Sequence, residues 1–263
     1  MSDLVWSVDD GVGTIMLNRP QKRNALTIMM IREWEHVLRA AKNDDEVRVI
    51  VLTGAGDQAF CAGVDLASLT TANPDRTPLE RKLELHDEIQ RVAVAVEDFD
   101  KPIVASINGV AVGAGLDMAL MCDMRVMSTN ARVSEGYVKL GLAPGDGGAY
   151  YLPRLVGMSK ALELLLTGDF IEAEEALRIG LVNRIARSEQ LAAETTRLAR
   201  SIAANPPMSV RMIKRATRQS ATTDLRTALD LVSSHVAILA STQDAAEALA
   251  AFREKRSPQY HGR

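Results

Sequence analysis

Cysteine is nearly absent from this chain of 263 residues, in which only Cys61 and Cys122 occur. Two cysteines cannot form a disulfide framework, so a reducing compartment is the better expectation. The first residues lack the basic start and apolar stretch of a secretory signal, and no apolar run is long enough for a membrane span. The sequence therefore predicts a cytoplasmic protein that does not enter a membrane.

An excess of charge is also missing, because 31 basic residues stand against 34 acidic ones and give a net charge of −3. This balance gives no broad attraction to nucleic acid or anionic lipid. The four histidines have no metal-ligand spacing, and the chain contains no Gly-x-x-x-x-Gly-Lys phosphate loop. We therefore expect no nucleic-acid partner, no metal and no tightly bound cofactor.

What is present is the composition of a globular protein, with 47% apolar and 25% charged residues. Short β-branched runs predict strands at residues 12–17, 47–52, 103–107 and 124–127. Apolar residues at helical spacing predict helices at residues 26–41, 79–96 and 116–121. Strands that alternate with helices indicate an α/β fold.

The last quarter of the chain has a different pattern, which is wholly helical after about residue 188. Residues 241–244 resemble a capping box that opens a last helix over 244–253. A tail of helices without strands is typical of a packing or oligomerisation module. We predict a core of residues 1–200 that carries the active site, followed by a helical module of residues 201–263.

The Gly113-Ala114-Gly115 run could carry chemistry, because small residues let a ligand approach the backbone closely. A helix that begins there presents unpaired N–H groups, which stabilise an oxyanion when a second N–H converges from elsewhere. The alternative is that the glycines only permit tight packing of a strand against a helix. Asp117, in the first turn, is either an acid/base group or an ordinary partner of the helix dipole.

A third candidate segment, residues 133–148, brings Glu135, Tyr137 and Asp146 close together in sequence among several glycines. Such a stretch is either a loop that lines a ligand or an ordinary turn before a helix. Near the N-terminus, Lys22 and Arg23 form a basic pair that could hold a phosphate group.

Together these segments closely resemble the successive motifs of the enoyl-CoA hydratase/isomerase (crotonase) superfamily, in order and over essentially the whole chain. The matching segments are residues 18–26, 60–66, 108–123 and 140–148. The resemblance implies a spiral core of repeated ββα units, with C-terminal helices that assemble a homotrimer, often paired into a hexamer. It also implies an acyl-CoA substrate, so that coenzyme A arrives as part of the substrate.

The resemblance further implies that the N–H groups of Val64 and Ala114 form an oxyanion hole for the thioester carbonyl. The residues that it implies for the coenzyme A cleft are Lys22, Arg23, Ala25, Ala62, Asp65 and Leu66, with Phe252 and Lys255 from a neighbouring subunit. Polarising the carbonyl lets negative charge build on its oxygen, either as water adds at Cβ or as a proton leaves.

The sequence departs from the well-known hydratases at both of their glutamates. Asp117 stands at the first position, and Tyr137 stands at the second, where a phenol with an ordinary pKa near 10 is a poor base. Glu135, expected on the same strand face as Tyr137, or Asp146 could supply the missing carboxylate. In a hydratase we therefore expect one of these two within a few ångströms of the Asp117 carboxylate.

Three functions follow from these observations. The leading one is a hydratase that adds water to a 2-enoyl-CoA, and the alternative is a double-bond isomerase that needs a single base. The third is a non-catalytic binding protein, since some relatives bind RNA through a lysine-rich first helix. Residues 27–41 contain no lysine, which argues against RNA binding. The segment 69–78 is expected to be a loop, and in this family that region often shapes the acyl pocket. The sequence therefore does not predict which acyl chain is used.

Overall fold

The computed structural model describes residues 2–65 and 75–263, and within these residues the strands form two sheets. The six-stranded sheet has the order β1 (Leu4–Asp9), β2 (Val12–Leu17), β3 (Val49–Gly54), β5 (Ile103–Ile107), β7 (Met124–Ser128) and β10 (Arg184–Ala186). The four-stranded sheet has the order β4 (Ala59–Cys61), β6 (Val110–Val112), β8 (Arg132–Ser134) and β9 (Ile171–Glu172). The strands from β2 to β10 in the larger sheet pair in parallel, whereas β1 runs antiparallel to β2.

The chain winds through the two sheets in repeated units. β3, β5 and β7 each enter the larger sheet, and the next strand along the chain, β4, β6 or β8, enters the smaller one. A helical segment then leads to the following unit, and in the second unit this segment is α4 (Ala114–Leu120). The α/β fold class and its repeated ββα units are confirmed.

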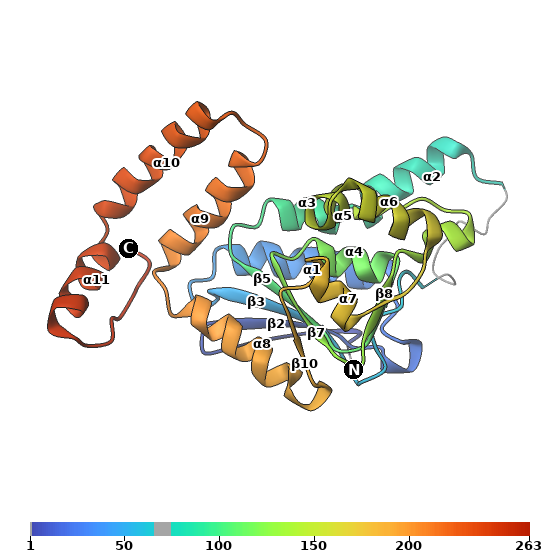
Figure 1. The fold of residues 1–263 in the computed structure, drawn as a ribbon, viewed down its shortest axis with the longest axis horizontal. Helices are drawn as coiled ribbons and strands as arrows, with labels where there is room; N and C mark the ends of the chain where they lie inside the picture. The colour runs from blue at the N-terminus through green and yellow to red at the C-terminus, as the bar shows by residue number, and fades with distance from the viewer. Residues whose placement is uncertain (1, 66–74) are drawn as a thin grey trace.

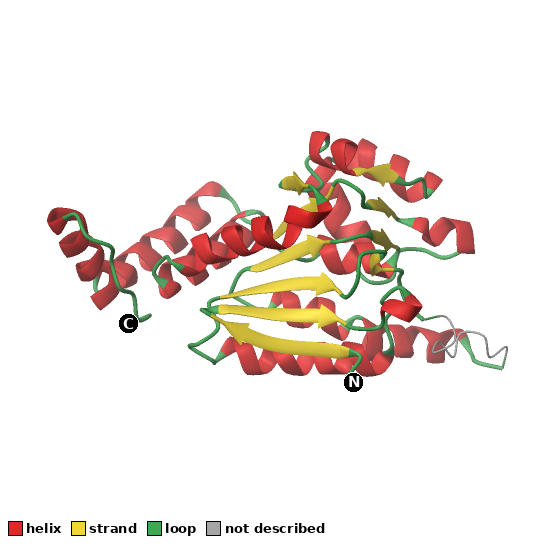
Figure 2. Cartoon of the chain, turned by 90° about the horizontal axis from the view of Figure 1, so that it is seen from below, coloured by secondary structure: helices red, strands yellow, loops and turns green. Residues whose placement is uncertain are grey.

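The central parallel strands of the larger sheet are buried on both faces, as parallel strands usually are, whereas the edge strand β1 is partly exposed. Ile50 and Leu52 of β3 belong to one apolar cluster, which includes Trp34 of α1 (Ile28–Lys42). Val49 and Val51 belong to the other cluster, which is closed by α8 (Ser188–Ala203). Figure 1 shows α8 across the sheet from α1 and α4, and Figure 2 shows the strands edge to edge.

The single helix expected over residues 79–96 is wrong. The structure has α2 (Pro78–Glu84), a π-helical turn η3 (Leu85–Ile89) and α3 (Arg91–Glu97) in its place. The interruption is a π-bulge, in which the Gln90 N–H donates to the carbonyl of Leu85 at 2.9 Å. The bulge matters for the site, because Leu85 and Ile89 line its cavity.

The capping box expected at residues 241–244 is also wrong in its details. Thr242 caps α11 (Gln243–Glu254) by accepting the N–H of Ala245. The Asp244 carboxylate does not close a box, because it accepts the N–H groups of His261 and Gly262, both at 2.8 Å. Asp244 therefore fixes the end of the chain rather than the start of the helix.

The remaining helical elements bring the chain around the smaller sheet and out to the C-terminus. They are η1 (Pro20–Lys22), η4 (Gly136–Leu140), α5 (Gly148–Val156), α6 (Met158–Thr167), α7 (Ala173–Arg178), α9 (Pro207–Ser220) and α10 (Leu225–Ala240). Among the described residues, no helix is long and apolar enough to cross a membrane.

Helices α9, α10 and α11 project away from the sheets (Figure 1). The helix α10 is apolar along much of its length, yet none of its residues is buried, and Leu225, Leu229 and Val236 are exposed. α8, which precedes this module, packs on the sheet and ends at Ala203. The boundary near residue 200 stays a prediction, and so does the assembly that the module serves.

Candidate active site

A cavity of about 280 Å³ lies where the second unit of the spiral meets the turn after β4. One wall is backbone, from Gly63 and Val64 on one side and from Gly113 and Ala114 on the other. A second wall is apolar and is formed by the side chains of Leu85, Ile89, Leu140 and Leu142. At the polar end stand Tyr137 and Asp146, whose hydroxyl and carboxyl groups are hydrogen-bonded at 3.0 Å.

The backbone wall depends on two glycines with positive φ, Gly63 at +97° and Gly113 at +53°. A Cβ atom on Gly63 would lie 3.0 Å from the carbonyl oxygen of Val112 and 3.9 Å from the nitrogen of Ala114, so the two turns approach closely. No hydrogen bond within the described residues takes the N–H of Val64 or of Ala114, which is the first residue of α4. The geometry leaves both donors beside the cavity.

Gly115 has a different purpose from Gly113. A Cβ atom on Gly115 would lie 2.1 Å from the carbonyl oxygen of Cys61, so only glycine lets α4 pack against β4. The Gly113-Ala114-Gly115 run thus satisfies both interpretations of its sequence, with one glycine shaping the turn and the other permitting the packing.

Three carboxyl groups cluster at and behind the polar end of the cavity, and all are buried: Asp117 is 0% exposed, Glu135 is 1% and Asp146, which lines the cavity, is 3%. The Tyr137 hydroxyl joins two of them, at 2.7 Å from Asp117 Oδ2 and 3.0 Å from Asp146 Oδ2. A Cβ atom on Gly148 would lie 2.4 Å from Asp117 Oδ1 and 2.9 Å from each carboxylate oxygen of Glu135. The structure thus brings together all four side chains that the sequence singled out.

The expected reason for the proximity of Glu135 and Tyr137 is wrong. They do not share a strand face, because β8 ends at Ser134 and the 3₁₀ helix η4 begins at Gly136. The chain folds tightly there, with the Tyr137 N–H donating to the Glu135 carbonyl at 2.6 Å. The two side chains therefore approach Asp117 from different sides, one at each of its carboxylate oxygens.

Within the described residues no lysine or arginine forms an ion pair with these carboxyl groups. Burial raises the pKa of Asp117, and the donated Tyr137 hydroxyl offsets this rise only in part. Burial, and then the neighbouring Asp117, raise the pKa of Glu135, and burial raises the pKa of Asp146. Burial and the adjacent carboxylates also raise the pKa of Tyr137, so the cluster retains protons at neutral pH.

The family comparison decides what this arrangement belongs to. A model described as Enoyl-CoA hydratase/isomerase matches residues 7–263. The chain belongs to the enoyl-CoA hydratase/isomerase family.

Members of the family support the assignment over the full length. The chain is 36% identical to a short-chain-enoyl-CoA hydratase of Clostridium acetobutylicum, over 97% of this chain and 96% of that protein. It is 34% identical to a 1,2-epoxyphenylacetyl-CoA isomerase of Escherichia coli, over 100% of both. A crystal structure of an enoyl-CoA hydratase from Bacillus anthracis superimposes with a TM-score of 0.93 at 33% identity, covering 100% of both chains.

In this member of the enoyl-CoA hydratase/isomerase family, the two segments expected to bind coenzyme A lie side by side. The Ala62 N–H donates to the Arg23 carbonyl at 3.0 Å, and the Asp65 N–H donates to the Leu26 carbonyl at 2.8 Å. Lys22 and Ala25 flank the same stretch, whereas Leu66 lies outside the described residues. The Asp65 carboxylate accepts a hydrogen bond from Arg19 at 2.9 Å, a partner that the sequence reasoning missed.

In a single subunit of this protein, Phe252 and Lys255 do not line the cavity. Phe252 is 85% exposed in α11, and Lys255 ends that helix in the left-handed conformation. Leu85, Ile89 and Gly148 were missed as site residues. The first two were hidden in an apolar helical pattern, and the sequence signal for the third was its place beside Asp146 in the stretch rich in glycine.

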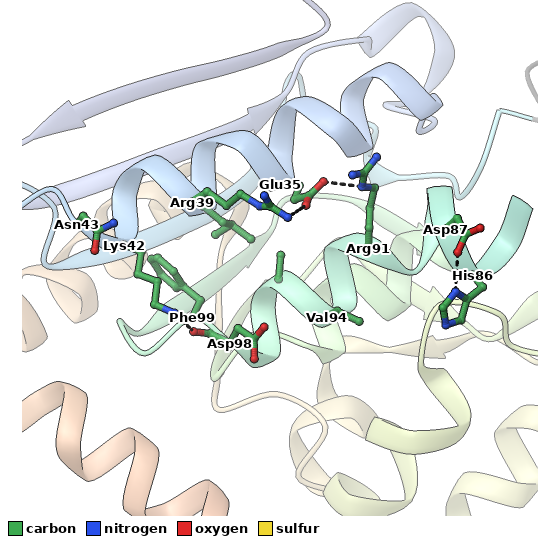
Figure 3. Close-up of a pocket in the computed structure, with 12 residues that line it drawn as sticks. Glu35, Arg39, Lys42, Asn43, His86, Asp87, Arg91, Val94, Asp98 and Phe99 are labelled. Carbon is green, nitrogen blue, oxygen red and sulfur yellow. Dashed lines mark hydrogen bonds and ion pairs between the residues drawn. The ribbon is translucent and has the colours of Figure 1, made fainter. Parts of the chain in front are cut away.

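A second hollow, of about 590 Å³, lies between α1, η3 and α3 and is shown in Figure 3. Its buried carboxylate is already paired, because Glu35 bonds to Arg39 at 2.6 Å and to Arg91 at 2.5 Å. Among residues 2–65 and 75–263 no group of His, Cys, Asp or Glu side chains has the arrangement of a metal site. The cavity beside Tyr137 is therefore the candidate active site.

Proposed function

We propose that this family member is a hydratase that adds water across the double bond of a 2-enoyl-CoA thioester. The observation that carries the proposal is the meeting of Tyr137, Asp146 and the two backbone donors in one cavity. Hydration needs one group that takes a proton from water and another that delivers a proton to Cα. A single acid/base group facing the substrate would suit an isomerase instead, whereas here the Tyr137 hydroxyl and Asp146 both line the cavity.

The N–H groups of Val64 and Ala114 bind the thioester oxygen in this proposal. They are fixed by the turns at Gly63 and Gly113 before the substrate arrives, so no reorganisation is needed as charge develops on the oxygen. Each such donor is typically worth about 3 kcal/mol of transition-state stabilisation. Lys22, Arg23, Ala25, Ala62 and Asp65 line the coenzyme A cleft that leads to this hole.

The apolar wall defines the acyl group. Leu85, Ile89, Leu140 and Leu142 contact the chain beyond Cβ, and none of the described side chains around the cavity is basic. A terminal carboxylate there would be desolvated without a partner, which is strongly unfavourable. The preferred substrates therefore have uncharged, hydrocarbon acyl chains.

The partner that covers the C-terminal module is a second copy of the chain, in a homotrimer or a hexamer. The exposed apolar side chains of α10 and the exposed Phe252 support this assembly. In it, Phe252 and Lys255 of one subunit reach coenzyme A bound to the next. Sedimentation at micromolar concentration measures the assembly, and a monomer would contradict it.

In the decisive experiment the purified protein is incubated with 2-enoyl-CoA and 3-enoyl-CoA esters of several chain lengths, the rate of turnover is measured, and the products are identified. The expected result is a 3-hydroxyacyl-CoA from the 2-enoyl esters, with dicarboxylic analogues turned over poorly. Conversion of 3-enoyl esters into 2-enoyl esters without hydration would replace the hydratase by an isomerase.

A further inference from the structure

The hydrogen bonds of Tyr137 impose a count of protons on the site. Its hydroxyl lies within bonding distance of Asp117 Oδ2 and of Asp146 Oδ2. A phenol has one hydrogen, which it can donate to one of these oxygens, while its own oxygen accepts from the other. The bond with the second carboxyl group therefore requires a proton on that carboxyl group. At least one of the pair is therefore neutral, and the other accepts the Tyr137 hydrogen.

Asp117 and Asp146 differ in their access to substrate. Asp146 and Tyr137 line the cavity, whereas Asp117 is fully buried and does not. The Tyr137 ring lies against the start of α4, 3.5 Å from where a Cβ atom of Gly113 would be. Among the described residues, the Tyr137 hydroxyl is thus the group that joins Asp117 to the cavity by a hydrogen bond.

Resting on the proposed hydratase function, we propose that Tyr137 is the catalytic proton donor to Cα and that it relays protons between Asp146 and Asp117. Asp146 is the base that faces the water. Asp117 acts through Tyr137 and is a positioning residue that supplies the replacement proton. The replacement of a glutamate by tyrosine therefore inserts a relay rather than removing the acid/base function.

The step balances without any reactant besides water. In the ready state Asp146 is ionised and Asp117 is protonated. As the oxygen of water bonds to Cβ, its O–H bond breaks and that proton passes to Asp146. The electron pair of the double bond takes the Tyr137 proton to form the Cα–H bond, and the Asp117 proton passes to the Tyr137 oxygen.

The product state has Asp146 neutral and Asp117 ionised, an arrangement that the proton count also permits. A shift of two protons along the same line restores the ready state. One proton moves from Asp146 to the Tyr137 oxygen, and the other moves from Tyr137 to Asp117. The two hydrogen bonds of 2.7 and 3.0 Å are short enough for both transfers.

The test is a double-mutant cycle on the rate of hydration with Tyr137→Phe, Asp117→Asn and the two combined. Tyr137→Phe keeps the ring and is expected to lower kcat about a hundredfold or more, with little change in KM. Asp117→Asn is expected to do the same, although the residue does not touch substrate. The combined variant is expected to lose no more than either single variant, because Asp117 acts through the hydroxyl.

Tyr150→Phe on α5 is the matched control, since Tyr150 is exposed and its ring packs on Arg154, and it should leave kcat and KM unchanged. Losses that multiply in the combined variant would overturn the relay, and so would an Asp117→Asn variant with altered KM and normal kcat. If Asp117→Asn does not fold, the hydration rate of the wild type is measured against the fraction of D₂O in the solvent, and the shape of this dependence tests the relay. Several protons in flight give a curved dependence, and a straight line would overturn the proposal.

Failure of the proposed function is distinguishable from failure of the relay. A wild-type protein that isomerises without hydrating defeats the hydratase, and the same cycle is then measured on isomerisation. Non-additive losses there would still support Tyr137 as the relay, and additive losses would reject it.

Discussion

Two groups of ionisable side chains, one buried and one partly buried, lie at the two ends of α4 and follow opposite rules. At its start the acid cluster, Asp117, Glu135 and Asp146, has no cation in contact among the described residues. Just past its end Asp123 bonds to Lys214 at 2.7 Å and to Arg218 at 2.9 Å, and it accepts the Ile103 N–H at 2.8 Å. We call Asp123, Lys214 and Arg218 the α9 anchor, because it ties α9 to the core.

The comparison teaches how charge serves two purposes in one fold. In the α9 anchor opposite charges satisfy each other, and the group is structural. In the acid cluster the carboxyl groups are buried without cations to pair with, so they retain protons, and this lowers the stability of the folded protein. Such an arrangement is typical of groups that carry out acid/base chemistry. Removing an ionisable group should therefore destabilise the protein at the anchor and stabilise it at the acid cluster.

The largest effect is expected from Asp123→Ala. The change leaves Lys214 buried without its counterion and leaves the Ile103 N–H without an acceptor. Breaking a buried pair from one side typically costs about 3–5 kcal/mol, so the free energy of unfolding in urea should fall by that amount. Turnover per folded molecule should stay near normal. Asp98→Ala, which removes an exposed carboxylate, is the control and should leave the urea midpoint unchanged.

The opposite sign is expected from Glu135→Gln. The folded protein keeps Glu135 protonated while the unfolded chain ionises it, so the wild type loses stability as pH rises above the ordinary carboxyl pKa. Glutamine removes this loss, and the gain at pH 7 should be on the order of 2 kcal/mol, since the buried amide must also be desolvated.

The pH dependence provides the control for that variant. The gain should vanish near pH 4, where Glu135 is protonated in both states, and should grow as pH rises. Unfolding in urea at a fixed protein concentration measures it, because an assembly makes apparent stability depend on concentration. A gain that stays constant from pH 4 to pH 8 would contradict the raised pKa.

The smallest effect is expected from Lys214→Met. Asp123 keeps Arg218 and the Ile103 N–H, and methionine fills the volume of the apolar stem. Desolvation lowers the pKa of Lys214, which means that burying its charge costs stability. Removing the charge therefore offsets part of the stability that is lost with its bonds. A loss of about 1 kcal/mol in urea unfolding is expected, well below that of Asp123→Ala. Equal losses for the two variants would mean that the anion is not the centre of the anchor.

The sequence was sufficient for the fold class because local periodicity reports burial. Strand-like runs such as residues 103–107 alternate with segments whose apolar residues have helical spacing, which indicates the α/β class. The spiral arrangement was implied by the resemblance of the ordered motifs to the family. The π-turn at Leu85–Ile89 could not be predicted, because one extra residue in a helix leaves the apolar pattern almost unchanged. Boundaries such as that of β3 shifted by two residues for similar reasons.

The four acid/base candidates were identifiable from the sequence, but their arrangement was not. Tyr137 was expected to be a poor base, and its hydroxyl instead joins Asp117 to Asp146 across 20 and 9 residues of chain. Such contacts depend on how α4, η4 and the start of α5 pack, which no local pattern specifies. The partnership of Asp65 with Arg19, 46 residues apart, was hidden for the same reason.

The central claim is that the acid cluster holds protons at neutral pH, and infrared spectroscopy of the carboxyl groups tests it most directly. At pH 7 the wild type should show the C=O stretch of a protonated, buried carboxylic acid, and the spectrum of Glu135→Gln should lack that band. That band should shift in D₂O only slowly, because Glu135 is buried. Loss of an ionised carboxylate band instead would show that Glu135 is charged, and it would contradict the account of the acid cluster.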